Sequence, residues 1–112
     1  MSEQTIDPAV FGEMQDLMDD ALGEFISTYL DNSPRLISKI AQGLSADDTE
    51  LIYHSAHQLK GGSGSIGAMG LFELAQQIEK ISRAGSVENL DALLQQLQTE
   101  FEQVKTALQP YT

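Results

Sequence analysis

Apolar residues recur at intervals of three and four along most of the chain, which is the spacing of one face of an α-helix. No segment sustains the alternation of apolar and polar residues that marks a half-buried strand, so the pattern predicts helices and no sheet. A first short helix is expected over residues 8–18, because Asp7 can serve as its N-cap and Pro8 suits the first helical position. Residues 1–6 are expected to form a flexible tail before it.

A second apolar stripe begins at Leu22 and stays in phase as far as Leu44. Pro34 interrupts the backbone hydrogen bonds of this segment but not the phase of the stripe, which predicts one long helix with a kink or a loosened turn near 30–34. The helix is expected to close at Gly43-Leu44-Ser45. Ser45 or Asp47 is then the expected N-cap of the next helix.

Three further helices follow from the same spacing. The third is expected to end at 64–66, with Gly67 and Gly70 bracketing a tight connection, and the fourth to end at Gly85. The last is expected to begin at Ser86. The prediction is an all-α fold: an antiparallel up-down-up-down four-helix bundle, with the short N-terminal helix capping one end.

The third predicted helix carries a histidine on the side away from the core. On a helix projection, His57 lies about 140° from the centre of the apolar stripe, on the flank or in solvent. Gly61 lies one turn beyond it and Gly64 two turns beyond it, on nearly the same meridian. The stripe that defines the buried face consists of Ile52, Ala56, Leu59, Ser63 and Ile66.

Glycines are costly in this helix. Gly61, Gly62 and Gly64 together would destabilise it by about 2–3 kcal/mol relative to alanine, since each costs roughly 0.5–1 kcal/mol. A bare meridian beside an exposed imidazole is expected where a bulky partner must approach that imidazole. A flexible glycine loop that simply follows the histidine is the alternative, and spacing alone leaves both open.

The residues around His57 resemble the signature of histidine-containing phosphotransfer (HPt) domains of bacterial phosphorelays. In that family the histidine is followed by Lys at the third position and Gly at the fourth, and then by a run of small residues that ends near Gly-Ala. The resemblance extends to the flanking helices and covers most of the 112 residues. The matching residues are Ala56-His57-Gln58-Leu59-Lys60-Gly61, followed by Gly64-Ser65-Ile66-Gly67-Ala68.

This resemblance implies a phosphorelay intermediate. His57 would accept a phosphoryl group from the aspartyl phosphate of a receiver domain and pass it reversibly to the aspartate of another receiver. An imidazole suits the task, because its ordinary pKa of about 6.5 leaves a nitrogen free to attack near neutral pH. The partners would be response-regulator receiver domains, of a hybrid sensor kinase and of a downstream regulator. Each receiver would bring its own Mg²⁺, and this chain would bind no cofactor.

Three neighbours of His57 are candidates for the same chemistry. Lys60, one turn along, can neutralise phosphate oxygens as a point charge, and a solvated surface lysine is the alternative. Gly61 and Gly64 would clear space for the receiver and the phosphoryl group. Close packing against a neighbouring helix is the alternative for the glycines.

On the fourth helix, the family often has an amide or an acid that hydrogen-bonds the other imidazole nitrogen and so determines the tautomer. Glu79 falls at this position, and Gln76 lies one turn away. An ordinary interhelical contact is the alternative for either residue.

Composition narrows the class of partner. Six Lys and Arg against seventeen Asp and Glu give a net charge of −11, which argues against binding to nucleic acid. No apolar run is long enough to span a membrane, and no basic, apolar leader is present, so a cytoplasmic protein is expected. We also expect a monomer and a single domain over 1–112. A stand-alone module is expected from the length, although a piece of a larger sensor kinase would look the same. Eight acidic residues precede the first base, Arg35; Arg35 and Lys39 lie one turn apart and are expected to contact an acidic partner.

Other functions were weighed against the relay. Glu50, His54 and His57 share one helix face, which Glu79 could approach. A di-iron bundle needs a Glu-x-x-His motif on each of two helices, and this chain has that motif on neither, so no metal site is expected. His54 lacks the Lys and Gly that follow His57 and is expected to be structural or solvated. A helical adaptor that carries no phosphoryl group remains an alternative. An autokinase is not expected, because the chain has no glycine-rich nucleotide loop.

Overall fold

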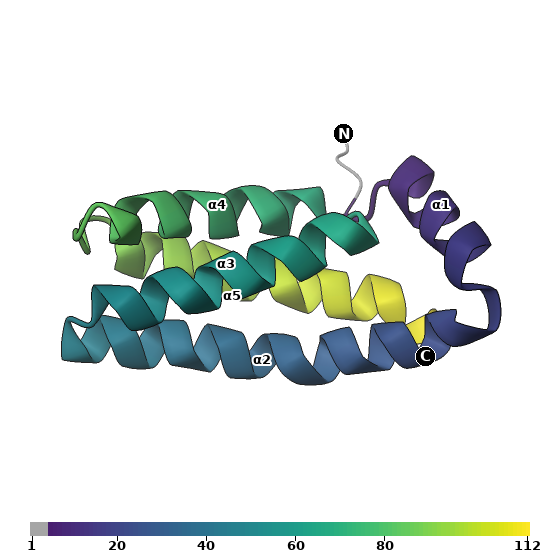
Figure 1. The fold of residues 1–112 in the computed structure, drawn as a ribbon, viewed down its shortest axis with the longest axis horizontal. Coiled ribbons are helices and arrows are strands. Elements are labelled where there is room, and N and C mark those ends of the chain that lie inside the picture. The colour runs from purple at the N-terminus through teal and green to yellow at the C-terminus, as the bar shows by residue number, and fades with distance from the viewer. Residues whose placement is uncertain (1–4) are drawn as a thin grey trace.

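The computed structural model describes residues 5–112, and in that part of the chain every regular element is a helix (Figure 1). The prediction of an all-α fold is therefore confirmed. The elements are α1 (Pro8–Met18), a 3₁₀ turn η1 (Asp19–Ala21), α2 (Leu22–Ala46), α3 (Thr49–Ile66), α4 (Met69–Arg83), α5 (Leu90–Leu108) and a second 3₁₀ turn η2 (Gln109–Tyr111).

The four long helices form an antiparallel bundle in which each helix packs against two others. α3 lies between α2 and α4, and α5 closes the ring against α4 and α2. Figure 1 shows the short helix α1 crossing one end of the bundle, next to the start of α2. This is the predicted up-down-up-down arrangement with its N-terminal capping helix.

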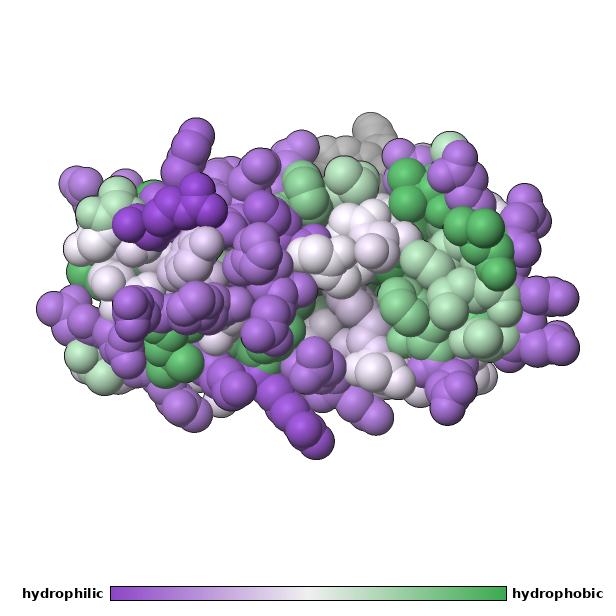
Figure 2. All heavy atoms as spheres, viewed as in Figure 1, coloured by the Kyte–Doolittle hydropathy of each residue, from purple (hydrophilic) through white to green (hydrophobic). Residues whose placement is uncertain are grey.

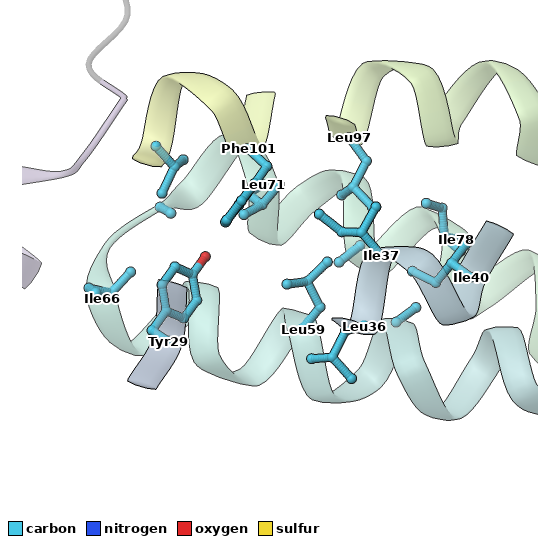
Figure 3. Packing of buried hydrophobic residues seen from close by; sticks show 14 of the residues in the cluster. Tyr29, Leu36, Ile37, Ile40, Leu59, Ile66, Leu71, Ile78, Leu97 and Phe101 are labelled. Carbon is cyan, nitrogen blue, oxygen red and sulfur yellow. The ribbon is translucent and has the colours of Figure 1, made fainter. Parts of the chain in front are cut away.

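The inward faces of the helices enclose one hydrophobic cluster (Figure 3). The stripe predicted for the third helix is buried along its whole length, from Ile52 to Ile66. A polar contact crosses this core, because the hydroxyls of Tyr29 on α2 and Ser63 on α3 lie 2.8 Å apart. Burial raises the pKa of Tyr29 to about 12, although the hydrogen bond with Ser63 partly offsets that effect.

Helix α2 is continuous through Pro34, as predicted. Proline has no N–H to donate to the preceding turn, so the ladder lacks one bond at Pro34. Just before it, the Ser33 hydroxyl donates to the Tyr29 carbonyl at 2.7 Å. The predicted caps at the end of α2 were wrong. Asp47 adopts a left-handed conformation (φ 56°) that ends α2, and it is Asp48 whose carboxylate accepts the Leu51 N–H and caps α3.

Two other boundaries differ from the prediction. Gly70 lies inside the first turn of α4, so Gly67, with φ 88°, is the residue that makes the turn after α3. Helix α5 begins at Leu90 rather than at Ser86. The Ser86 hydroxyl accepts the N–H of Glu88 and so supports a local turn instead of a helix.

The segment before α1 contacts the bundle at a position nearer to the N-terminus than predicted. Ile6 was placed in the tail over 1–6, yet it is partly buried against the hydrophobic cluster. The Asp7 N–H donates to the Gly67 carbonyl at 2.8 Å, and the Asp7 carboxylate caps α1. Residues 1–4 of the predicted tail lie outside the described residues.

Candidate functional site

Helix α3 runs unbroken through its glycines and so presents His57 on a rigid element rather than beside a loop. The flexible glycine loop, one of the two alternatives that the sequence left open, is therefore wrong. The His57 side chain is 58% exposed, as the helix projection predicted. The imidazole is therefore accessible to another protein while its backbone is held by the bundle.

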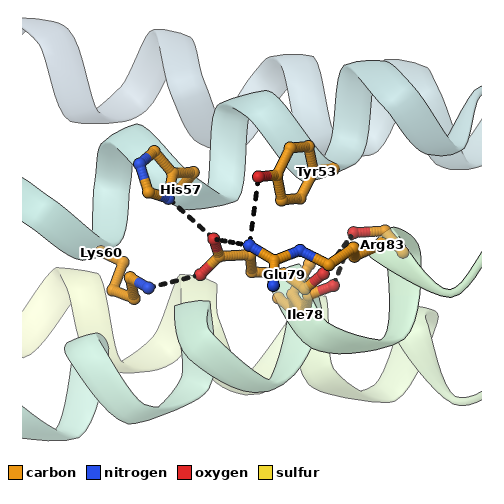
Figure 4. Close-up of polar contacts among 7 residues, drawn as sticks. Tyr53, His57, Lys60, Ile78, Glu79 and Arg83 are labelled. Atoms are coloured by element: carbon orange, nitrogen blue, oxygen red, sulfur yellow. Dashed lines mark hydrogen bonds and ion pairs between the residues drawn. The ribbon is translucent and has the colours of Figure 1, made fainter.

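Glu79 reaches His57 from the neighbouring helix α4 (Figure 4). Its Oε2 atom lies 2.7 Å from His57 Nδ1, so the hydrogen bond that the resemblance implied is present. Its other oxygen, Oε1, lies 2.6 Å from Lys60 Nζ. The carboxylate itself is only 5% exposed, so the two contacts form in a setting where water competes little.

These contacts determine which ring nitrogen carries the proton. An ionised carboxylate only accepts hydrogen bonds, so His57 Nδ1 must donate to Glu79. In the neutral ring the proton then resides on Nδ1, and Nε2 has a free lone pair. Figure 4 shows this second nitrogen pointing away from Glu79 and α4.

The ionisation of Glu79 follows from the same geometry. Burial by itself would raise the pKa of this carboxyl, but the hydrogen bonds from Lys60 and His57, together with their positive charge, outweigh burial and lower the pKa below its ordinary value. Glu79 is therefore a carboxylate at neutral pH.

Two further residues complete the cluster, and their role was not predicted. Arg83, one turn beyond Glu79, lies 3.6 Å from Glu79 Oε2 and donates to the Tyr53 hydroxyl at 3.2 Å. Its guanidinium lies over the Tyr53 ring, 5.2 Å from the centroid, and that ring is 6.1 Å from the imidazole of His57. The available signals were the i, i+4 spacing from Glu79 to Arg83 and from Tyr53 to His57.

The glycines of α3 differ in their surroundings. A Cβ placed on Gly61 would meet nothing within 4 Å, so the surface beside His57 is open there. A Cβ on Gly64 would lie 3.0 Å from the Phe72 ring, and one on Gly62 would lie 3.3 Å from Tyr29. Close packing, given above as the alternative, therefore applies to Gly64 as well as to Gly62.

The remaining candidates lie apart from this cluster of contacts. Gln76 is exposed and is not a partner of the His57 ring, whose Nδ1 is taken by Glu79. Arg35 and Lys39 are exposed on α2 and make no ion pair within residues 5–112. His54 is exposed too, with its ring 5.0 Å from that of Tyr53.

Within the part of the chain that the structure describes, no three His, Cys, Asp or Glu side chains come together in a way that could hold a metal ion.

Across residues 5–112, none of the helices combines the length and the apolar character needed to cross a bilayer.

The fold and the site together define a class of protein: a helical bundle that displays an exposed histidine whose tautomer is set by a buried acid on the next helix. Comparison with known proteins agrees. The family model described as "Hpt domain" matches residues 24–107. The chain belongs to the Hpt domain family, and it is a phosphorelay intermediate.

Similar proteins are known from plants and bacteria. Histidine-containing phosphotransfer protein 2 of Arabidopsis thaliana is 33% identical over 106 residues, which cover 88% of this chain and 68% of that protein. Histidine-containing phosphotransfer protein 4 of the same plant is 33% identical over 107 residues, which cover 90% of this chain and 84% of that protein. The crystal structure of histidine-containing phosphotransfer protein B (HptB) from Pseudomonas aeruginosa PAO1 superposes with a TM-score of 0.92, at 28% identity, covering 97% of this chain and 95% of that one. Hpt proteins work with response-regulator receiver domains in phosphorelays.

Proposed function

We propose that His57 Nε2 is the atom that carries the phosphoryl group. The lone pair on Nε2 attacks the phosphorus of a receiver's aspartyl phosphate, the P–O bond to that aspartate breaks, and the carboxylate leaves. The group later moves to the aspartate of a second receiver by the reverse process. The observation that carries this proposal is the exposed ring whose opposite nitrogen, Nδ1, is bound to buried Glu79.

The receiver is expected to supply the metal and most of the catalysis. Phosphoryl transfer depends on in-line positioning and on neutralising charge, and a receiver-bound Mg²⁺ would do both. This chain offers the nucleophile and no glycine-rich nucleotide loop. Purified protein incubated with ATP alone should therefore stay unlabelled, and label acquired without any kinase or receiver would contradict this.

Docking is expected on the face around His57, where Gly61 leaves the backbone bare.

Figure 2 shows that polar residues cover much of the molecule in this view, with an apolar area over α1 and the start of α2. Leu17, which is 85% exposed, belongs to α1. Arg35 and Lys39 are exposed and form no ion pair within residues 5–112, so both are available to an acidic partner. We expect the chain to act as a cytoplasmic monomer.

Labelling by phosphorylated receivers tests the proposal. A panel of receiver domains, each charged with ³²P-labelled acetyl phosphate and Mg²⁺, is mixed with wild type, with His57→Gln and with His54→Gln. Acid-labile label should appear on wild type and on His54→Gln, and not on His57→Gln. His54→Gln is the matched control, because it removes an exposed imidazole from the same helix.

The same experiment separates the relay from a helical adaptor. An adaptor would bind receivers equally well with Gln at position 57 and would take up no label. Label on any side chain other than His57 would overturn the assignment of the site.

A further inference from the structure

Apolar side chains gather on the outer side of α1. Leu17 is 85% exposed, and Met14, one turn before it, is only half-buried. Met18 shares this face, because positions i, i+3 and i+4 lie together on a helix. Neither methionine packs against the hydrophobic cluster, and Phe11 is the residue of α1 that is buried. Met14, Leu17 and Met18 therefore form an apolar surface that the bundle leaves uncovered, which we call the α1 patch (Figure 2).

The patch is displayed by a helix with a defined position. Phe11 packs edge-on against the ring of Tyr111, with the two centroids 4.8 Å apart. After α1 the chain turns at Asp19, whose φ of 47° and ψ of −112° are rare for a residue with a Cβ. Tyr111 is itself 44% exposed, and Leu17 and Tyr111 are the large hydrophobic residues that are exposed in the described part of the chain. Exposed apolar surface is thus concentrated at the α1 end of the molecule.

The side chains around the α1 patch are acidic. No Lys or Arg occurs in the sequence before Arg35, so α1 and the start of α2 carry no base. Within residues 5–112, none of the acids next to the patch takes part in an ion pair. The exposed acids within one turn of the patch are Glu13, Asp16, Asp19 and Asp20.

This combination of apolar surface and negative charge limits the kind of partner. A second copy of the chain would bring four more acids to the same place, and like charges across an interface are unfavourable. Nucleic acids and anionic membranes are repelled for the same reason. A complementary surface is apolar with a basic rim. An amphipathic helix rich in Lys and Arg has this character, and methionine side chains adapt readily to the apolar face of such a helix.

We propose that the α1 patch binds a basic amphipathic helix of another protein, with the apolar face of that helix on Met14, Leu17 and Met18 and its basic side chains beside the four acids. The contact is small, so binding should be weak and reversible.

The patch lies apart from the face around His57. Ile66, at the end of α3, is nine residues beyond His57, which is about 14 Å along the helix axis. Helix α1 crosses the bundle at that end, where Asp7 bonds to Gly67 (Figure 1). A helix on α1 and a receiver at His57 should therefore be able to bind at the same time.

A synthetic peptide tests the proposal. The probe is a fluorescein-labelled peptide of Leu and Lys, about five helical turns long, whose leucines recur with helical spacing. A second peptide has the same composition with its leucines spread around the helix. Fluorescence anisotropy should show that wild type binds the first peptide at least about tenfold more tightly than the second. Equal binding would show attraction by net charge alone and would refute the proposal.

Two substitutions test whether the peptide binds at the α1 patch. Leu17→Gln should weaken binding of the amphipathic peptide by about tenfold, because a few apolar anchors carry most of the binding energy. Glu13→Gln should weaken it by about twofold to threefold. Circular dichroism melting verifies that each variant is folded. Unchanged binding by folded Leu17→Gln would rule out the patch as the site.

Glu102→Gln is the matched control for charge. It also removes one exposed acid, since Glu102 is 70% exposed, but from α5 rather than from α1. It should weaken binding less than Glu13→Gln does. If both substitutions weakened binding equally, the peptide would be responding to the charge of the whole molecule, against the proposal.

NMR locates the peptide on the wild-type protein. Changes in the backbone nitrogen-15 and proton shifts should be confined to α1, η1, the start of α2 and the C-terminal turn η2. Changes centred on His57 would place the peptide elsewhere and contradict the proposal.

The α1 patch and the relay can be tested separately. His57→Gln should bind the amphipathic peptide as tightly as wild type. Saturating peptide should leave the labelling of wild type by a charged receiver unchanged; inhibition would mean that the patch belongs to the surface on which receivers dock, and the proposal would fail. Absence of labelling from every receiver would count only against the proposed function, because binding of the peptide does not involve His57.

Discussion

At the scale of single residues, the site is organised by one buried carboxylate. Glu79 accepts hydrogen bonds from His57 and Lys60 through separate oxygens, with Arg83 close to one of them. The residues that it joins come from two different helices, so Glu79 links the chemistry of the site to the packing of α3 against α4. A mutation at this position should therefore affect stability as well as transfer.

The stability contributed by Glu79 should depend on pH. Its pKa in the folded protein lies below the ordinary value of 4.5, so the folded state favours the carboxylate, and this stabilisation is present above pH 4.5. It is lost as the pH falls below 4.5 and through the lowered pKa of the folded state. Glu79→Gln should reduce the free energy of unfolding by about 1–2 kcal/mol at neutral pH, and the difference from wild type should be smaller at about pH 3.

Urea unfolding of wild type and Glu79→Gln at both pH values measures this difference. Glu102→Gln is the control, because Glu102 is 70% exposed and its effect should be small at either pH. A deficit in Glu79→Gln that stays constant from neutral pH to about pH 3 would refute the assigned ionisation.

At the scale of elements, α3 combines a buried face typical of any bundle helix with an outer face that is unusually bare. The packing of α3 against α2 and α4 offsets the free energy by which its glycines destabilise the helix, because most helical stability in proteins comes from burial of the apolar face. The three glycines have separate structural reasons. Gly62 and Gly64 give room to aromatic rings of the neighbouring helices, whereas Gly61 faces open space.

Gly61→Ala should therefore separate stability from function. Alanine at this open helical position should stabilise the protein by about 0.5–1 kcal/mol, because glycine is the poorer helix former. The added methyl group should nevertheless slow phosphoryl transfer from a receiver, since it lies beside the attacking ring. Chemical denaturation and the labelling assay measure the two effects.

Gly12→Ala is the matched control for this prediction. Gly12 lies in the interior of α1, and a Cβ there would also meet nothing within 4 Å. It should give a similar gain in stability with no loss of transfer. If Gly61→Ala transferred as fast as Gly12→Ala, the bare surface beside His57 would have no role in docking.

At the scale of the whole molecule, charge is the dominant feature. Seventeen Asp and Glu against six Lys and Arg give a net charge of −11 on 112 residues, which makes the folded chain repel itself. The cations have different roles: Lys60 and Arg83 face Glu79, whereas Arg35 and Lys39 have no ion-pair partner in residues 5–112. Arg35 and Lys39 are therefore exposed cations on an otherwise acidic molecule.

Salt should stabilise the molecule. Raising NaCl from about 0.01 M to about 0.15 M shortens the screening length from about 30 Å to about 8 Å, which weakens repulsion between surface carboxylates. The short, buried pair between Lys60 and Glu79 is screened less. The melting temperature should rise over this range at neutral pH and rise less at about pH 4, where many carboxyls are protonated. A melting temperature that falls with salt would show that ion pairs outweigh self-repulsion.

Much of the fold could be predicted because it depends on local patterns. The stripe from Ile52 to Ile66, the continuity of α2 through Pro34 and the cap at Asp7 each follow from residues within a few turns of one another. The misplaced boundaries have a common cause. Asp48 and Ser86 each accept a hydrogen bond from the backbone N–H of a nearby residue. Several neighbouring side chains could make the same kind of bond, and only the path of the chain determines which of them does.

The sequence by itself determined the helical bundle, the outward direction of His57 and the resemblance that led to Glu79, because helical period and motif spacing are properties of neighbouring residues. Only the tertiary structure decided that Lys60 and His57 share one buried carboxylate, that Arg83 is held by Tyr53, and that Phe72 fills the space beside Gly64. These contacts join α3 to α4, and their geometry depends on the rotation and register of one helix against the other. That geometry is set by how the whole core packs, which no single stretch of sequence specifies.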